Sequence, residues 1–326
     1  IELDPVCPES HDNLSHILLK QKKFIEGWEK YEWRLKVKDI IIAKRPETSK
    51  PEWSPGNRGR VFVWPEQGIG DEIMHLSLIP DFIDIVDKVI IKTDKRLIPL
   101  LKRTLSDSIQ YLAEEDFIDE KEYDFHISLG SIPRYLRRTL ESFKQSKKLC
   151  FKVNEKRSND LRNKLLNDKV DKLVGISWKS SSDQKKYQCE ILTLEKIILG
   201  IYSPKIRFVN LQYGKVEEDI KSVKEKYGID IFDIEEVDKF NDIDDLAALI
   251  NACDEVVSTT NVTVNLTGTL GKSGKILIPN NHLWPWGLND ERSYWYPSLK
   301  LFRQSKDGEW KLALEKIRDE IVIAEI

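Results

Sequence analysis

The sequence predicts an α/β protein made of two doubly wound, Rossmann-like domains that face each other across a cleft, preceded by a short α-helical hairpin. Short apolar runs that suit buried strands alternate with helical patterns over most of the 326 residues, as in parallel sheets covered by helices. A stretch rich in charged residues, 144–171, interrupts the alternation. Because the length also exceeds that of a typical single domain, we place the change of domain in this stretch.

Three parts of the chain are therefore expected. Residues 1–45 hold the helical hairpin, 46–160 the first Rossmann-like domain, and 161–326 the second. The second domain should end in a helix at about 309–321 that crosses back and ties the two domains together.

Composition restricts the class of protein. Hydrophobic residues make up 40% of the sequence, charged residues 33%, and the formal net charge is −3, which suits buried cores and gives no reason to expect nucleic-acid binding. No apolar run approaches a membrane span and no signal peptide is visible, so we expect a cytoplasmic protein. The four cysteines and five histidines are scattered, which predicts reduced thiols and no metal site. The sequence begins with Ile, which suggests a piece of a longer protein.

The first helices are predicted by the segment NLSHILLKQKKFIEGWEKYEWR. Its second half places Phe24, Trp28 and Tyr31 on one helix face, at spacings of four and three residues. A hairpin of this length cannot bury its apolar face alone, so it must pack on another surface. The pattern resembles the last unit of a tetratricopeptide-repeat array, and the alternative is a hairpin that simply docks on the next domain.

The segment RVFVWPEQGIGDEIMHLS, residues 60–77, organises the first domain. Val61–Val63 predicts a short buried strand, and Gly68-Ile69-Gly70 a tight turn that needs the conformational freedom of glycine and leaves room for a ligand. Asp71 follows at the expected start of a helix, where the helix dipole favours negative charge. Asp71 is thus either a reactive carboxylate at a pocket rim or an N-cap that satisfies helix amides.

Polar loops after two strands mark the second domain. WKSSS follows the strand at 173–178, and STTNVT follows the strand at 255–258. In open α/β sheets, ligands bind beyond the carboxyl ends of the strands, and a cation with hydroxyls and a helix N-terminus suits a diphosphate. The alternative is ordinary helix capping by these residues. The candidate ligand-binding residues of the chain are Gly68, Gly70, Ser177, Lys179, Ser180, Thr260, Asn261, Val262 and Thr263.

These segments also carry a family resemblance. WPEQGIGDEIMHLSLIP, GISWKSS, STTNVTVNLTGTLGK and LWPWG followed by SYWYPSLKLFRQ resemble GT-B glycosyltransferases related to the bacterial lipopolysaccharide heptosyltransferases. The subgroup in which this catalytic unit follows tetratricopeptide repeats is the most similar. The resemblance implies two Rossmann-like domains, a nucleotide-sugar donor held mainly by the second, an acceptor at the first, and inverting, metal-independent transfer without a cofactor.

The resemblance also implies roles for single residues. Asp71 falls on the general base of heptosyltransferase-like enzymes, and Lys179 on a phosphate-binding lysine. The nucleotide-site motif falls on Thr260–Gly268, and here the sequence departs from the family pattern. Thr260 stands where an aspartate is common and Asn265 where a histidine is common, so the base and sugar of the donor stay open.

Three functions are compatible with these observations. The first is an inverting glycosyltransferase that acts on a glycan or a protein, including a peptide held by upstream repeats. The second is a non-catalytic GT-B relic that serves as an interaction module. The third is a sugar-nucleotide epimerase, which needs further acid–base carboxylates near Asp71, for which Glu66 and Glu72 are the candidates.

Overall fold

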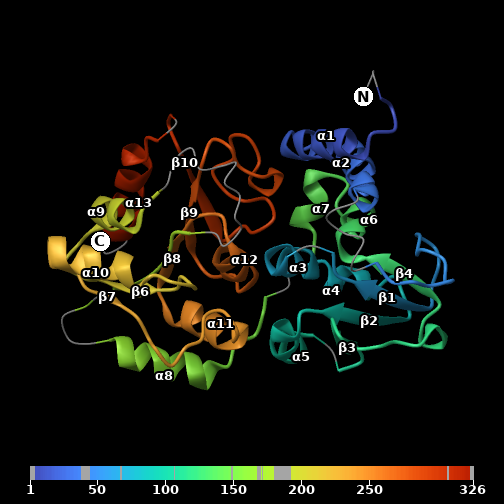
Figure 1. Cartoon of the computed structure of the whole chain (residues 1–326), viewed down its shortest axis with the longest axis horizontal. Coiled ribbons are helices and arrows are strands. Elements are labelled where there is room, and N and C mark those ends of the chain that lie inside the picture. The colour runs from blue at the N-terminus through green and yellow to red at the C-terminus, as the bar shows by residue number, and fades with distance from the viewer. Residues whose placement is uncertain are drawn as a thin grey trace. The chain divides into compact units, whose positions relative to one another are not determined.

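The computed structural model describes residues 4–37, 45–66, 68–105, 107–147, 150–166, 170, 172–179, 192–306 and 308–323. The chain divides into two compact units (Figure 1). Unit 1 comprises residues 1–152 and 283–289, and unit 2 comprises residues 153–282 and 290–326. The observed change of unit thus lies between Lys152 and Val153.

Unit 1 is built on a four-stranded parallel sheet with the order β3-β2-β1-β4. Apolar runs form its inner strands because both faces are covered. Its strands are β1 (Arg60–Trp64), β2 (Lys88–Thr93), β3 (Gln110–Ala113) and β4 (Phe125–Ser128). Its helices after the hairpin are α3 (Ile69–Leu76), α4 (Ile79–Phe82), η2 (Lys95–Leu97), α5 (Ile98–Thr104), η3 (Glu120–Glu122), η4 (Leu129–Ser131), α6 (Pro133–Leu136) and α7 (Leu140–Lys144).

The helical hairpin consists of α1 (Pro8–Lys20) and α2 (Phe24–Tyr31), which runs on into the 3₁₀ helix η1 (Glu32–Lys36). Its predicted apolar face is confirmed, because Phe24, Trp28 and Tyr31 are all buried. The Phe24 ring lies against Phe143 of α7, and the Trp28 indole nitrogen donates to the Arg137 carbonyl at 2.7 Å. The hairpin is therefore an integral part of unit 1, and its origin as the end of a repeat array stays a prediction.

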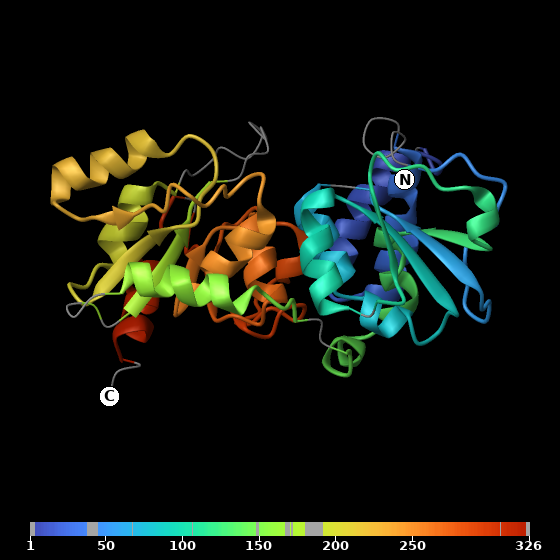
Figure 2. The same ribbon diagram turned by 90° about the horizontal axis from the view of Figure 1, so that it is seen from below.

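Unit 2 is built on a six-stranded parallel sheet with the order β10-β9-β8-β5-β6-β7. Helices α9, α10 and α13 share one hydrophobic cluster with this sheet, and α11 packs against α8 and α12 (Figure 2). The strands are β5 (Lys172–Ser177), β6 (Ile206–Asn210), β7 (Ile231–Phe232), β8 (Glu255–Ser258), β9 (Gly274–Ile278) and β10 (Leu299–Arg303). The helices are α8 (Glu155–Leu165), α9 (Leu194–Ile201), α10 (Glu217–Tyr227), α11 (Ile243–Ala252), α12 (Val262–Thr269) and α13 (Lys311–Ile323).

The segment that returns to unit 1 is 283–289, which contains the 3₁₀ helix η6 (Trp284–Trp286). The Trp284 ring packs edge-on against Trp28, with 5.2 Å between the ring centroids. The sequence predicts that the last helix makes the return, whereas α13 packs against α9 within unit 2. Four aliphatic residues of α9 and α13 would be exposed without this contact, which explains the position of the helix: they are Ile197, Ile201, Leu314 and Ile317.

Among the helices that the structure describes, none is long and apolar enough to cross a lipid bilayer.

Candidate functional site

The turn between β1 and α3 differs in detail from the sequence prediction. Gly68 is the N-cap of α3, in extended conformation with φ −70° and ψ 164°, and Gly70 lies inside the helix. Neither glycine therefore uses the left-handed conformation that the predicted tight turn required. A Cβ atom at Gly68 would meet nothing within 4 Å, so the second part of the prediction, open space beside this backbone, agrees with the structure.

Asp71 is not the N-cap of α3, which corrects the capping alternative. It is the third residue of the helix, and its backbone N–H donates to the Gly68 carbonyl at 2.9 Å. No hydrogen bond or ion pair of its carboxylate is found among the described residues. Burial and the negative charge of Glu66 raise the pKa of Asp71 to about 6, against the opposing effect of His16. Burial and the charge of Glu66 thus outweigh the helix dipole, which would lower the pKa of Asp71. The carboxylate is therefore a stronger base than a solvated aspartate.

Glu66 lies five residues before Asp71 and is held by Arg34 of η1. The Arg34 guanidinium donates from Nε to Glu66 Oε2 and from Nη2 to Glu66 Oε1, both at 2.6 Å. Burial alone would raise the pKa of Glu66, but the charge and hydrogen bonds of Arg34 lower it below its usual value. Glu66 is therefore an ionised partner of Arg34.

Glu72 is also occupied by structural contacts. Its Oε2 accepts hydrogen bonds from the Thr93 hydroxyl at 2.7 Å and the Asp94 N–H at 3.1 Å, so it ties α3 to the end of β2. His75, one turn further along, is buried, and burial lowers its pKa to about 4. A small cavity of about 10 Å³ lies among Glu66, Asp71, Glu72, His75, Leu129 and Gly130.

In unit 2, the polar residues after β5 and β8 meet around Gln212, which the sequence analysis missed. Gln212 Oε1 accepts hydrogen bonds from the Ser177 hydroxyl and from the backbone N–H groups of Trp178 and Lys179, at 2.8–2.9 Å. Asn261 Nδ2 donates to Ser177 Oγ at 2.7 Å and to the Lys179 carbonyl at 3.0 Å. The loop after β5 and the start of α12 are thus joined by side-chain hydrogen bonds.

The start of α12 has the features of an anion site. Asn261 is its N-cap and accepts from the Val264 N–H, as the capping interpretation predicts. Thr260 is half-buried and Val262 begins the helix, while the hydroxyl of the buried Thr263 has no hydrogen-bond partner in the described part of the chain. Asn265, at the position where the resemblance leads us to expect a histidine, accepts from the Tyr296 hydroxyl at 3.3 Å.

Lys179 is half-exposed, and its ammonium forms an ion pair with Asp219 of α10. Asp219 also accepts a hydrogen bond from the Trp178 indole nitrogen at 3.1 Å. An anion that binds Lys179 must therefore compete with Asp219. Ser180, the remaining predicted ligand residue of this loop, lies outside the described residues.

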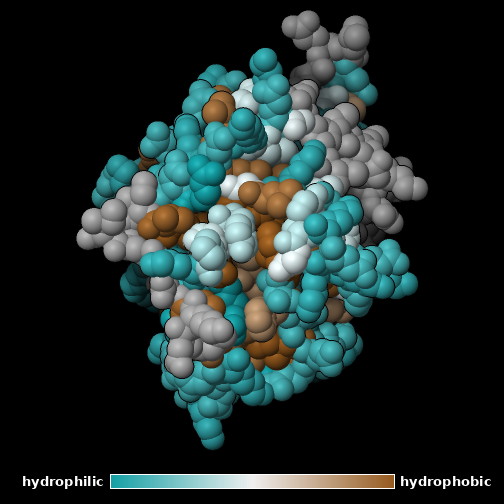
Figure 3. Space-filling model, turned by 90° about the vertical axis from the view of Figure 1, so that its left-hand side faces the viewer, coloured by the Kyte–Doolittle hydropathy of each residue, from teal (hydrophilic) through white to brown (hydrophobic). Residues whose placement is uncertain are grey.

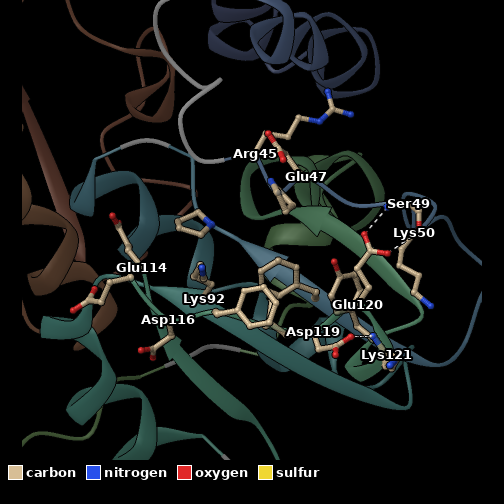
Figure 4. A pocket seen from close by; sticks show the side chains of 17 residues that line it. Arg45, Glu47, Ser49, Lys50, Lys92, Glu114, Asp116, Asp119, Glu120 and Lys121 are labelled. Atoms are coloured by element: carbon tan, nitrogen blue, oxygen red, sulfur yellow. Dashed lines mark hydrogen bonds between the residues drawn. The ribbon is translucent and has the colours of Figure 1, made fainter.

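A cavity of about 870 Å³ lies in unit 1 (Figure 4). Its lining includes Pro65, which follows β1, Lys92 near the end of β2, and residues 114–118, which follow β3. It is therefore at the carboxyl edge of the sheet, where ligands of open α/β sheets bind. In Figure 4, Lys92 lies between Glu114 and Asp116 on one side and Asp119, Glu120 and Lys121 on the other. Glu120 is engaged by Ser49, whereas Lys92 forms no ion pair with a described residue.

A second cavity, of about 780 Å³, lies between α9 and α13 in unit 2 and includes the exposed Leu199 and Leu312. The side of the molecule in Figure 3 is mostly hydrophilic, with hydrophobic side chains exposed near its centre. Besides the two helices, the cavity between α9 and α13 is lined by Ser305, Gly308, Glu309 and Trp310 of the loop that joins β10 to α13, and we do not assign it to a ligand. No group of three or more His, Cys, Asp or Glu side chains suited to a metal ion occurs within the described ranges.

No protein-family model matches this sequence. A relative, Protein FlbA of Caulobacter vibrioides, is 29% identical over 321 residues, which make up 92% of this chain and 53% of FlbA. The chain thus spans about half the length of this relative. The fold of the present chain is similar to that of the glycosyl transferase family 9 protein from Veillonella parvula. The TM-score is 0.59 and the identity 12%, over 84% of this chain and 99% of the other.

ADP-heptose lipopolysaccharide heptosyltransferase II of E. coli gives a TM-score of 0.56 and 11% identity, over 82% of this chain and 99% of the other. At such identities the likeness shows the fold and not the activity. The α/β fold with parallel sheets is therefore that of GT-B glycosyltransferases, as the sequence predicts.

Proposed function

We propose that this chain is an inverting, metal-independent glycosyltransferase that moves a sugar from a nucleotide-diphosphate sugar to a hydroxyl of a glycan or a protein. The observation that carries the proposal is the environment of the Asp71 carboxylate. Its carboxylate is half-buried, unpaired among the described residues, and has a pKa of about 6. A base with this pKa is mostly ionised at neutral pH yet still accepts a proton readily.

The proposed reaction requires the donor sugar and the acceptor hydroxyl to meet at Asp71. The acceptor oxygen attacks the anomeric carbon from the side opposite the diphosphate, Asp71 takes the hydroxyl proton, and the bond from the anomeric carbon to the diphosphate oxygen breaks. Negative charge then grows on the diphosphate. We assign the donor to unit 2, where the N-terminus of α12 and the Lys179 ammonium can stabilise that charge.

The epimerase alternative loses its candidate residues. Such an enzyme needs a second carboxyl group that exchanges protons, but Glu66 is engaged in a bidentate contact with Arg34 and Glu72 with Thr93 and Asp94. The relic alternative predicts no turnover, and the following experiment separates it from the enzyme.

The experiment compares the parent with Asp71→Asn. A panel of nucleoside diphosphates is screened by thermal shift to find the donor base, since a ligand at 100 times its Kd stabilises by about 2.7 kcal/mol. Release of that nucleoside diphosphate from its sugar conjugates is then measured with candidate acceptors. Asp71→Asn should bind the nucleotide like the parent and transfer roughly 10²–10⁴-fold more slowly. Transfer at the parent rate would refute the assignment of the base.

A further inference from the structure

The guanidinium of Arg34 joins three segments of unit 1 that are far apart in the sequence. Besides its two bonds to Glu66, it donates from Nη2 to the hydroxyls of Ser128 and Ser131, each at 3.0 Å. From Nη1 it donates to the Tyr31 carbonyl at 2.9 Å. The end of the helical hairpin, the loop after β1 and the loop after β4 therefore meet at one side chain.

This cluster is closed to solvent and closely packed. Arg34 is 2% exposed and Glu66 5%. The Gly130 N–H donates to Glu66 Oε1 at 3.0 Å, and a Cβ atom at Gly130 would come within 2.8 Å of the same oxygen and 3.0 Å of Arg34 Nη2. Glycine at position 130 thus allows the carboxylate to approach the backbone. Strands β1 and β4 are neighbours, so both loops start at the same edge of the sheet.

The cluster lies directly before the segment that carries the proposed base. Gly68 caps α3 without a side chain, and the Asp71 carboxylate forms no hydrogen bond with a described residue. The position of Asp71 is therefore not set by a hydrogen bond or ion pair of its own side chain with a described residue. Among the described residues between β1 and Asp71, Glu66 has side-chain hydrogen bonds to other segments. Its negative charge also raises the pKa of Asp71.

We propose that Arg34 is a positioning residue for Asp71: by its bidentate hold on Glu66 it fixes the loop that presents the base, so the helical hairpin is part of the active centre. This inference rests on the proposed role of Asp71. Arg34 itself is buried and does not need to touch a substrate. A lysine cannot replace it, because an ammonium offers a point charge and not a planar fork.

The test uses Arg34→Lys and the double variant Arg34→Met/Glu66→Met. The double variant replaces the buried Arg34–Glu66 pair with apolar side chains, a change that commonly preserves folding. Glu32, whose Oε1 also accepts from Arg34 Nη1 at 3.0 Å, loses this partner but is 17% exposed and can be solvated. Arg137→Lys is the matched control, since Arg137 is also buried and pairs with Asp81 at 2.6 Å in the same unit without contacting Glu66. All variants are compared by thermal melting, peptide-level hydrogen exchange and turnover.

We expect Arg34→Lys to increase hydrogen exchange in peptides covering 66–76 and 129–131, and to lower kcat on the order of 10²-fold with unchanged affinity for the nucleoside diphosphate. In the double variant, the acidic limb of the pH–rate profile should also move to lower pH, because the negative charge beside Asp71 is lost. Arg137→Lys should show neither change.

Parent-like exchange in 66–76 and a parent-like rate in Arg34→Lys would overturn the proposal. Global unfolding of this variant, with exchange raised throughout unit 1, would also overturn it, because Arg34 would then be a residue of general stability. Hydrogen exchange needs no substrate. If no nucleotide sugar reacts with the parent, the proposed function fails, yet exchange still decides whether Arg34 orders the loop of Asp71.

Discussion

Asp71 occupies a position where ionisation is costly, and this cost is what makes it a useful base. A solvated aspartate has a pKa of about 3.9 and is a weak proton acceptor. Burial and the neighbouring charge of Glu66 raise the pKa of Asp71 to about 6. The folded protein therefore binds a proton at this residue more tightly than the unfolded chain, and the stability of the fold and the reactivity of the base are opposed.

The first prediction concerns stability. The pKa of Asp71 is higher in the folded state, so the folded state loses stability as pH rises from about 4 to about 6. Asp71→Asn removes this loss and should be more stable than the parent by roughly 1–3 kcal/mol at pH 8. The difference should vanish at pH 3, where both side chains are neutral. Thermal melting at both pH values measures it, and a variant that is less stable than the parent at pH 8 would contradict the raised pKa.

The second prediction concerns Lys179 and Asp219. A diphosphate has to displace Asp219 from the Lys179 ammonium, so the two residues should have opposite effects on affinity. Lys179→Ala should weaken binding of a nucleoside diphosphate by about one to two decades, the value of a charge-assisted contact. Asp219→Asn should strengthen it, since it keeps an acceptor for Trp178 and removes the competing charge.

Isothermal titration with the nucleoside diphosphate found in the screen measures both effects. Lys221→Ala, an exposed lysine of α10 paired with Glu225, is the control. Unchanged affinity in Lys179→Ala would remove this lysine from the donor site.

Features of the site could be predicted from the sequence where their residues are contiguous, but not where the residues are far apart along the chain. Asp71 stands out because strand, glycines and helix start are contiguous. Glu66 and Arg34 are 32 residues apart, and Lys179 and Asp219 are 40 apart, so no local pattern indicates that these charges are paired. Gln212 follows a strand like many polar residues, and only the folded structure shows that its oxygen binds three donors.

At the scale of elements, the strands were predictable because each is a short apolar run between polar segments. The apolar runs at 61–63, 89–91 and 275–278 correspond to β1, β2 and β9. Residues 133–143 have the pattern of one helix, but they form two short helices, α6 and α7, because Thr139 caps a new helix with its side chain. A side-chain cap competes with continuation of the helix, and a periodic pattern alone does not show which of the two prevails.

The third prediction concerns the cavity beside β1, β2 and β3. We infer that it receives the acceptor, since it lies at the carboxyl edge of the sheet that presents Asp71. Lys92→Met keeps the aliphatic stem and removes the charge, so it should raise KM for the acceptor roughly tenfold or more and leave nucleotide affinity unchanged. Lys88→Met, at the exposed start of the same strand, should change neither. An unaltered KM in Lys92→Met would place the acceptor elsewhere.

At the scale of the whole molecule, the order of residues in the chain does not match their grouping in space. Residues 283–289 lie in the sequence between β9 and β10 of unit 2, yet they belong to unit 1. Tryptophan is suited to such a return because a large buried ring contributes much apolar area in few residues. The sequence pattern places the whole region after 161 in one domain, because a segment as short as 283–289 has no strand–helix pattern of its own.

The last prediction tests this grouping with two tryptophans that are equally buried. Trp284 and Trp310 are each 4% exposed, but Trp284 packs against Trp28 in unit 1 whereas Trp310 belongs to the core of unit 2. Replacing a buried tryptophan with alanine costs about 3–5 kcal/mol. That loss should appear in the unit that contains the ring, because contacts in the other unit are unchanged.

Hydrogen exchange measured by peptide therefore separates the two variants. Trp284→Ala should raise exchange in the hairpin, 24–36, and in α6 and α7, with β5 and β6 as protected as in the parent. Trp310→Ala should raise exchange in α9 and α13 and leave the hairpin unchanged. If Trp284→Ala instead loosened the sheet of unit 2, residues 283–289 would have to be reassigned to that unit. The hairpin that carries Arg34 would then lose one of its contacts within unit 1.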